Sequence, residues 1–214
     1  MRTIEKNTEP RSLLEYRAIP DTDYISMDAD VKRDLKVALL QEQGYVCCYC
    51  MKRISYDNMK VEHLQSQKDY PSKDLVYGNM FAACCGNEGY PKAHQHCDTR
   101  KGDDELGFDL KSPLLTKKID YNSNGTIYSS DPIIDYDINR KLNLNIERLR
   151  DNRKVVIDEA IQNLITIQKK GNWSVKTLKV ELSKWSCLNR ESKYPEYYGA
   201  AINYIEKKIR NMTR

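Results

Sequence analysis

The sequence predicts an α+β fold in which a turn-rich, cysteine-rich module precedes a mainly α-helical C-terminal half. Six of the seven cysteines and all three histidines fall between residues 47 and 97, where turn residues are many and helical periodicity is weak. An Asn-Gly pair further along, between two runs of alternating apolar residues, indicates a β-hairpin. From about residue 143, apolar residues recur at helical spacing.

The N-terminal part predicts an irregular arm followed by one helix. Residues 1–27 are polar and contain two prolines, which is typical of irregular backbone. The segment DADVKRDLKVALLQEQG predicts a helix, with Asp28 or Asp30 as its cap and Gly44 as its stop. The apolar stripe of this helix should pack on the cysteine-rich segment that follows, and it consists of Leu35, Ala38 and Leu39.

A hairpin is predicted in KKIDYNSNGTIYSS, because Asn and Gly at positions 124 and 125 both tolerate positive φ. It opens the last of three parts into which we divide the chain. These parts are an N-terminal arm (1–27), the cysteine-rich module (28–112) and the hairpin with the C-terminal helical region (113–214).

Three helices are predicted after the hairpin. The first should end at Gly171, the second should begin after a Ser174 cap, and the third should have Pro195 in its first turn. The apolar stripe of the first is interrupted by Arg153 and consists of Ile146, Leu149, Val156, Ala160, Leu164 and Ile167. The second should bury Leu178, Leu182 and Trp185, and the third Tyr198, Ile202, Ile205 and Ile209.

Composition excludes some classes of protein. The net charge of +4 is only mildly basic, so it is compatible with a polyanionic partner without requiring one. No run approaches the ~18 consecutive apolar residues of a membrane span. The first residues contain no apolar segment typical of a secretory signal, so we expect a cytoplasmic protein without a membrane partner.

The cysteine pattern favours a metal site over disulfides, because the cysteines are odd in number and crowded in one segment. Cys47-x2-Cys50 has the spacing at which a tight turn places two thiolates on one Zn²⁺. Spacing alone leaves the second pair of ligands open among Cys84, Cys85 and Cys97, with His94 and His96 as rivals. Cys48 and Cys187 are expected to be packed thiols.

Between these cysteines lies a set of residues suited to phosphodiester hydrolysis. His63 in KVEHLQSQ can act as general base, because an imidazole has a pKa near working pH. Glu62 and Asp98 can hold a hard cation, Mg²⁺ or Mn²⁺, through oxygen. Asn79 is expected to orient His63 by a hydrogen bond and to brace the hairpin. Basic residues that follow Asp98 are candidate nucleic-acid contacts, namely Arg100 and Lys101.

One geometric requirement follows from the order of these residues. Adjacent side chains in a regular strand point to opposite faces. Glu62 and His63 can therefore serve one site only where their strand ends or twists, beside the helix that carries Asp98.

The motifs CCYCMKRI, VEH, YGNMFAAC and HCDTRKGD resemble those of the HNH endonuclease family. The resemblance is to the bacterial branch found as the nuclease subunit of Septu-type and retron-associated anti-phage defence systems. The blocks IDYNSNGTIYSSD and LNLNIERLRDNR extend it over most of residues 30–155. It implies a zinc-stapled ββα-metal (HNH) module with His63 as base, Glu62 as metal ligand and Asn79 as the central Asn. The last position of the family pattern is usually His or Asn, and here it is Asp98.

The resemblance also implies the zinc ligands and the partners. It selects Cys84 and Cys97 as the second pair beside Cys47 and Cys50. Subunits of this kind assemble with an SMC/ABC-like ATPase and, in retrons, with a reverse transcriptase and its DNA–RNA product. The substrate implied is DNA or RNA, between which the motif does not discriminate.

Two alternatives stay open at this point. A non-catalytic, zinc-stabilised nucleic-acid-binding or adaptor module would need the same cysteines. The basic residues of the helical half could follow phosphates or form solvated helix faces, and they include Arg148, Arg150, Arg153, Lys154, Lys207, Lys208, Arg210 and Arg214. Three tyrosines could form a partner surface or pack into the core, namely Tyr194, Tyr197 and Tyr198.

Overall fold

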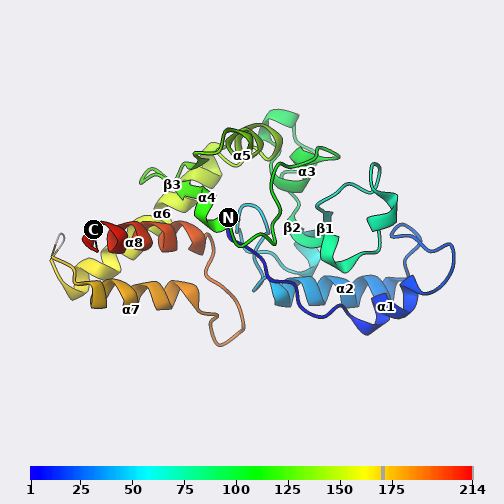
Figure 1. Ribbon diagram of the computed structural model, residues 1–214, viewed down its shortest axis with the longest axis horizontal. Coiled ribbons are helices and arrows are strands. Elements are labelled where there is room, and N and C mark those ends of the chain that lie inside the picture. The colour runs from blue at the N-terminus through cyan, green and yellow to red at the C-terminus, as the bar shows by residue number, and fades with distance from the viewer. Residues whose placement is uncertain (170–171, 214) are drawn as a thin grey trace.

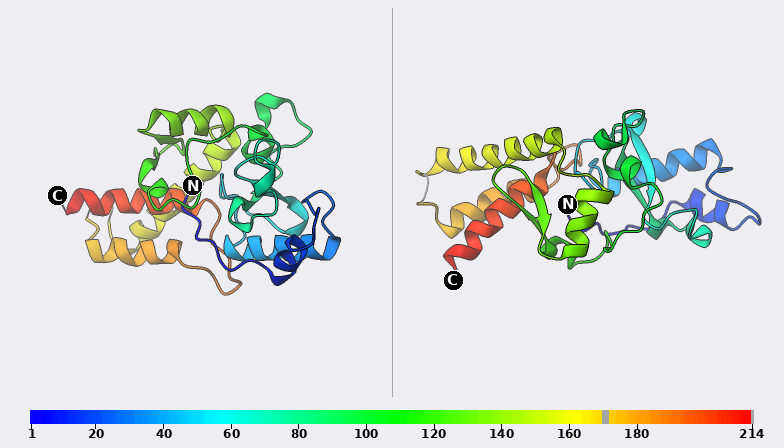
Figure 2. Two further views of the ribbon diagram at one scale, coloured as in Figure 1. Left: turned by 45° about the vertical axis from the view of Figure 1, so that its right-hand side comes forward. Right: turned by 90° about the horizontal axis from the view of Figure 1, so that it is seen from above.

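The computed structural model describes residues 1–169 and 172–213. The long C-terminal helices lie at one end of an elongated molecule (Figure 1). The hairpin of β1 (Met59–His63) and β2 (Met80–Cys84) lies toward the other end, with α1 (Arg11–Arg17) and α2 (Ala29–Glu42) beneath it. Two further views show the same separation, with the N-terminus between the two ends (Figure 2). The predicted stop at Gly171 and the cation Arg214 lie outside the described residues.

The N-terminal arm contains a helix, so the expectation of an irregular arm over 1–27 is wrong in part. Helix α1 (Arg11–Arg17) begins directly after Pro10 and buries Leu13 and Tyr16. A proline before the first helical residue is compatible with a helix start, because its fixed φ suits that position and no amide hydrogen is needed there. The prolines marked a boundary rather than continuous irregular structure.

Helix α2 (Ala29–Glu42) confirms the predicted helix and buries Leu35 and Leu39. Asp28 stands at its N-cap position, although its side chain makes no capping hydrogen bond. Next to its C-terminal end, the Gln43 amide donates to the Ala82 carbonyl and accepts from the Ala82 amide, both at 2.8 Å. These bonds fix α2 against a strand of the cysteine-rich module.

After α2, the cysteine-rich module contains one hairpin and one short helix. Strand β1 (Met59–His63) pairs antiparallel with β2 (Met80–Cys84), and His63 lies opposite Met80. Helix α3 (Cys97–Lys101) packs against β2, so that two strands and a helix form a ββα arrangement. Short helical turns connect these elements, namely η1 (Tyr56–Asn58), η2 (Pro71–Lys73), η3 (Tyr77–Asn79) and η4 (Lys92–His94).

The second hairpin is where the Asn-Gly pair predicts it. Strand β3 (Ile119–Tyr121) pairs antiparallel with β4 (Ile127–Ser129). Gly125 in its turn has φ +82°, and a Cβ there would lie 2.0 Å from the Arg150 carbonyl oxygen of α6. Only glycine therefore lets this turn approach the helix so closely. The neighbouring helical segments are α4 (Leu115–Lys118), α5 (Pro132–Tyr136) and the π-helical turn η5 (Asp137–Lys141).

Three helices complete the chain as α6 (Glu147–Ile167), α7 (Val175–Ser186) and α8 (Tyr198–Met212). The Ser174 side chain accepts from the Thr177 amide, which confirms the predicted cap of α7. Pro195 is not in the first turn of α8, because the helix starts at Tyr198 after Tyr197, whose φ is +52°. None of the helices within the described residues is both long and apolar enough to cross a bilayer.

Several side chains of the helical half lie deeper than a surface role allows. Arg153 is 2% exposed, so it is not a surface phosphate contact. Tyr197 is buried, whereas Tyr194 and Tyr198 are half-buried and stack with ring centroids 4.5 Å apart. The tyrosines therefore pack between the C-terminal segment and the rest of the chain. Lys207, one of the basic residues considered for phosphate contact, pairs with Asp120.

Candidate metal and catalytic site

Four buried cysteine sulfurs lie close together in the cysteine-rich module. The Sγ atoms of Cys47, Cys50, Cys84 and Cys97 all lie within 4.8 Å of one another. The Cys47–Cys97 and Cys50–Cys84 pairs are 3.9 and 3.8 Å apart. A tetrahedral Zn²⁺ with Zn–S bonds near 2.3 Å requires S–S edges of about 3.8 Å. The four sulfurs therefore have the spacing of a tetrathiolate metal site.

Local backbone structure explains how Cys47 and Cys50 face one point. The Met51 amide donates to the Cys47 carbonyl at 3.0 Å, and the Cys47 amide donates to the Lys52 carbonyl at 2.9 Å. Met51 has φ +65°, so the chain reverses tightly between α2 and β1. The other two sulfurs come from the last residue of β2 and the first residue of α3. One ion would thus join the turn, the hairpin and the helix.

The remaining candidate ligands divide clearly. Cys85 donates to the Asn58 carbonyl at 3.4 Å, Cys48 is buried outside the cluster, and Cys187 is exposed, contrary to its expected packing. His94 is exposed. His96 is the nearest rival, because its buried Nδ1 lies 3.1 Å from Cys97 Sγ and 3.9 Å from Cys84 Sγ.

Glu62 is a buried carboxylate on β1. It is 1% exposed, its Oε1 accepts from the Tyr49 hydroxyl at 2.7 Å, and Lys101 Nζ lies 2.9 Å from the same oxygen. Burial raises the pKa of Glu62 well above its usual range, as do the hydrogen bond and the charge of Asp98, and Lys101 opposes this change. Asp98 is therefore near enough to act on the Glu62 carboxyl group, and the Lys101 ammonium lies beside that group.

Asp98 lies in the first turn of α3, directly after a thiolate of the cluster, and its side chain is half-buried. Two carboxylates in contact repel each other unless a proton or a cation lies between them. A hard divalent cation prefers carboxylate oxygens. The donor set of Glu62 and Asp98 therefore fits Mg²⁺ or Mn²⁺, with water in the remaining positions.

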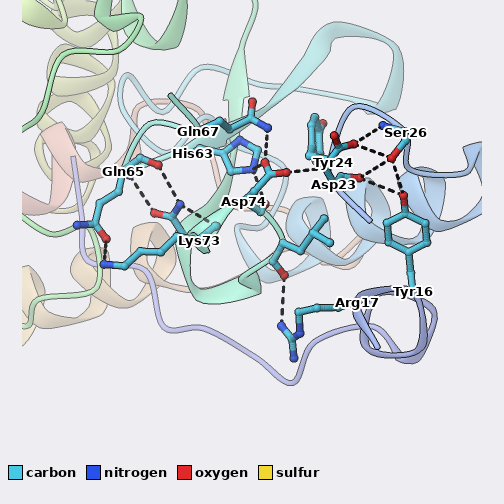
Figure 3. A network of polar contacts seen from close by, with 12 residues as sticks. Tyr16, Arg17, Asp23, Tyr24, Ser26, His63, Gln65, Gln67, Lys73 and Asp74 are labelled. Atoms are coloured by element: carbon cyan, nitrogen blue, oxygen red, sulfur yellow. Dashed lines mark hydrogen bonds and ion pairs between the residues drawn. The ribbon is translucent and has the colours of Figure 1, made fainter. Parts of the chain in front are cut away.

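His63 is the last residue of β1. Its Nε2 lies 2.9 Å from the Asp74 carbonyl oxygen and 3.7 Å from Asp74 Oδ1 (Figure 3). The Tyr24 ring contacts it edge to face at 4.9 Å. Because a carbonyl only accepts, Nε2 carries the hydrogen and Nδ1 is left as a proton acceptor. Burial lowers the pKa of His63, which keeps the imidazole neutral at pH 7.

Asn79 braces the loop between the strands. Its Oδ1 accepts from the Gln65 amide at 2.9 Å, and its Nδ2 donates to the carbonyls of Gln65 and Lys73 at 3.0 and 3.2 Å. The predicted hydrogen bond from Asn79 to the His63 ring is wrong, because the Asn79 side chain bonds to backbone groups of Gln65 and Lys73 instead. Asn79 acts on His63 only through the loop that carries Asp74.

Sequence reasoning missed Asp74 and Tyr24. The Asp74 carboxylate accepts from the Tyr24 amide at 2.6 Å and from the Gln67 side chain, so it is held between the N-terminal arm and the loop (Figure 3). Asp74 lies in a polar stretch that predicts only a turn. Tyr24 is distant in sequence and belongs to a segment without periodicity, so no pattern could have identified it.

The two predicted nucleic-acid contacts differ from each other. Lys101 is buried and donates to the His63 carbonyl at 3.1 Å as well as pairing with Glu62. Its ammonium is therefore not available to a phosphate, and the expected role of Lys101 is wrong for this structure. Arg100 is half-exposed and remains available.

Glu62, His63 and Asp98 do not form a closed cage. Within the described residues, the four cysteines are the only group of three or more potential ligands whose atoms all lie within 4.8 Å of one another. The charge of Asp98 nevertheless acts on the pKa values of both Glu62 and His63. The His63 ring contacts Asp74 and Tyr24, whereas the Glu62 carboxylate contacts Tyr49 and Lys101.

Comparison with known proteins adds one relative. No family model matches the chain. Over 133 residues, which are 58% of this chain, it is 27% identical to a Vibrio cholerae (serotype O1, biovar El Tor) protein named "Retron Vc95 putative HNH endonuclease". The aligned part spans 63% of that relative's length. The similarity supports an HNH endonuclease family and suggests a nuclease.

Proposed function

We propose that this protein is a metal-dependent HNH endonuclease that hydrolyses phosphodiester bonds of nucleic acid as the effector of an anti-phage defence complex. What supports the proposal is the position of Glu62 and His63 at the end of β1, where Lys101 of α3, three residues after Asp98, contacts the Glu62 carboxylate and the His63 carbonyl. The similarity to a protein named as an HNH endonuclease supports the same chemistry.

In this proposal His63 is the general base. Its Nδ1 takes a proton from the attacking water, while Nε2–H stays bonded to the Asp74 carbonyl. The imidazole becomes a cation in that step, and Asp74 Oδ1 at 3.7 Å stabilises the new charge. Because Asp74 is itself held by Tyr24 and Gln67, the ring keeps its orientation during proton transfer.

Glu62 and Asp98 would hold the catalytic Mg²⁺ or Mn²⁺. When bound, such an ion polarises the phosphate and stabilises charge on the leaving oxygen. Lys101 and Tyr49 both hold Oε1 of Glu62, which would leave Oε2 for the ion, and the charge of Lys101 opposes the rise in the pKa of Glu62 that burial causes. The four cysteines would hold a structural Zn²⁺ that sets the distance between β2 and α3.

The defence context is part of the proposal. The name of the Vibrio cholerae relative refers to a retron, and the sequence motifs resemble nuclease subunits of such systems. We propose that the chain assembles with an SMC/ABC-like ATPase and, in a retron, with a reverse transcriptase and its DNA–RNA product.

One observation favours a second candidate, a non-catalytic zinc-stabilised nucleic-acid-binding or adaptor module. Glu62 and His63 are 1% and 7% exposed, so the arm and the loop cover the base in this structure. An adaptor would need these side chains only for packing. Catalysis requires that Nδ1 of His63 reach a water at the substrate.

The deciding experiment measures cleavage of labelled DNA and labelled RNA by the chain together with the proteins encoded beside its gene. We expect cutting with Mg²⁺, none with EDTA, and a loss of about 10²- to 10⁴-fold in His63→Ala protein. Circular dichroism and zinc content of each variant exclude unfolding. Equal cutting by wild-type and His63→Ala protein would contradict the mechanism, and absence of cutting in all samples would favour the adaptor.

A further inference from the structure

Four cations gather on the outer side of α3, and we name them the basic ridge. They come from three separate segments: the turn before α3, α3 itself, and the stretch from η5 to the start of α6. Arg100 is half-exposed and the other three are exposed. The members of the ridge are Lys92, Arg100, Arg140 and Arg148.

Hydrogen bonds join the segments that carry the ridge. The Arg100 guanidinium donates to the carbonyls of Lys92 and Arg140 at 3.0 and 3.2 Å. Arg148 donates to Asn87 Oδ1 at 2.7 Å, and Asn87 Nδ2 donates to the His94 carbonyl at 2.7 Å in the turn that also holds Lys92. These bonds hold the three backbone segments that carry the four cations against one another.

The cations of the ridge are not neutralised by ion pairs within the described part of the chain. Across residues 1–169 and 172–213, none of its four cations takes part in an ion pair. Glu88, the acid next to Asn87, pairs with Lys60 at 2.6 Å. Two N–H groups of Arg100 already donate to carbonyls, and three of its five remain. Free donors on a basic surface are suited to phosphate oxygens.

The ridge and the catalytic carboxylates lie on opposite sides of α3. Asp98 and Lys101 face Glu62, whereas Arg100 contacts Lys92 and Arg140 on the outer side. A helix with its side chains is about 10–12 Å across. A single phosphate cannot contact both sides of the helix at once.

We infer that the basic ridge binds the second strand of a duplex whose first strand lies at His63, so that the substrate straddles α3. The placement of the first strand at His63 rests on the proposed nuclease function. The occupant of the ridge is a nucleic-acid phosphate backbone, and the geometry favours a duplex over a single strand because the two strands of a duplex present phosphates on both sides of a groove.

The test measures binding without cleavage, by fluorescence anisotropy on His63→Ala protein. The probes are a labelled 20-base-pair DNA duplex, an RNA duplex of the same sequence and each single strand. When Arg100→Ala and Arg140→Ala are added to this His63→Ala protein, we expect its affinity for the duplex to fall about tenfold. The slope of log affinity against log salt should become shallower by roughly one per lost contact. Single-strand affinity should change much less, and the duplex that binds more tightly identifies the substrate.

A matched control removes two exposed lysines from α7 at the other end of the molecule, Lys176→Ala/Lys179→Ala. It should leave duplex binding unchanged. Equal losses for both double variants, or no loss for the ridge variant, would overturn the inference. Equal losses for duplex and single strand would assign the ridge to a single-stranded substrate and also contradict it. If the ridge variant loses duplex binding but the wild-type protein cuts no substrate, the role of the ridge is supported and the proposed nuclease function is rejected.

Discussion

Two buried groups of potential ligands lie next to each other in this molecule, and they differ in how complete they are. The four cysteine sulfurs surround one point from all sides. Glu62 and Asp98 supply two carboxylates only, and no third potential ligand joins them in a compact group within the described residues. A structural zinc site has four protein ligands, whereas a catalytic site leaves positions for water and substrate. Within one ββα arrangement, the four cysteines therefore form a closed group of ligands, whereas the two carboxylates form an open one.

The two groups also differ in how their charge is balanced. Lys101 pairs directly with Glu62 at 2.9 Å. Near the thiolates, the buried Arg153 donates only to neutral oxygens, those of Gly125, Leu144 and Asn145, at 2.6, 2.9 and 3.0 Å. Burial lowers the pKa of Arg153 to about 10, and the charges of Cys50 and Cys97 oppose that change. Four thiolates on Zn²⁺ carry a net negative charge, so Arg153 would serve as their counter-charge.

The largest expected effect is the loss of the closed site. Cys47→Ser removes one of four ligands, and the binding free energy of a structural zinc ion, on the order of 10 kcal/mol, is also folding free energy. We expect loss of bound zinc and of the cooperative thermal transition, measured by metal analysis and circular dichroism. Cys187→Ser is the matched control, because Cys187 is exposed, and it should keep both. Retention of full zinc content in Cys47→Ser protein would show that His96 or another residue completes the site.

The second-largest effect is expected from Lys101, compared with its neighbour Arg100 on α3. Lys101→Met leaves the Glu62 carboxylate buried without its partner, which should cost about 3–5 kcal/mol of unfolding free energy. Arg100→Met loses two hydrogen bonds of a half-exposed guanidinium to the carbonyls of Lys92 and Arg140 and should cost less, about 1 kcal/mol. Urea denaturation of both variants measures the difference. If the two variants unfold alike, Lys101 does not balance the charge of the carboxylate pair.

A smaller effect should reveal the counter-charge of the zinc site. Arg153→Met loses hydrogen bonds to three neutral oxygens, which should cost about 1–3 kcal/mol, and in addition removes the charge near the thiolates. We expect faster transfer of zinc to a chromogenic chelator than in wild type. Asn145→Ala removes one of the same acceptors but no charge, so it should lower stability without altering the transfer rate. Identical zinc transfer in wild type and Arg153→Met would mean that Arg153 only bridges the hairpin turn and α6.

The sequence predicted the elements that depend on local pattern. Helix α2 and the cap of α7 follow from capping residues and periodic apolar positions, and the β3–β4 turn follows from Asn-Gly. Helix α1 was missed because Pro10 was taken as a break rather than as a start. The start of α8 was misplaced because Tyr197 adopts a positive φ that no propensity indicates.

The candidate site was predictable only where chemistry is tied to residue type. Cysteine spacing led to the four sulfurs that lie together, although the choice of Cys84 over Cys85 needed the family resemblance. The partners of His63 could not be predicted, because Asp74 bonds to it through a backbone carbonyl and the Tyr24 ring comes from a segment distant in sequence. Lys101 and Arg153 were expected at the surface, since burial of a cation depends on tertiary partners such as Glu62 and the carbonyls around the β3–β4 turn.

The difference between a closed and an open site is tested most directly by metal exchange. Protein that retains one zinc ion per chain is treated briefly with EDTA, and its cleavage of a labelled duplex is measured before and after addition of Mg²⁺. We predict that zinc stays bound, that cleavage stops with EDTA, and that Mg²⁺ restores it in wild type but not in Asp98→Ala protein. Cleavage that continues in EDTA, or that Mg²⁺ restores equally in Asp98→Ala protein, would contradict a second, carboxylate-bound metal.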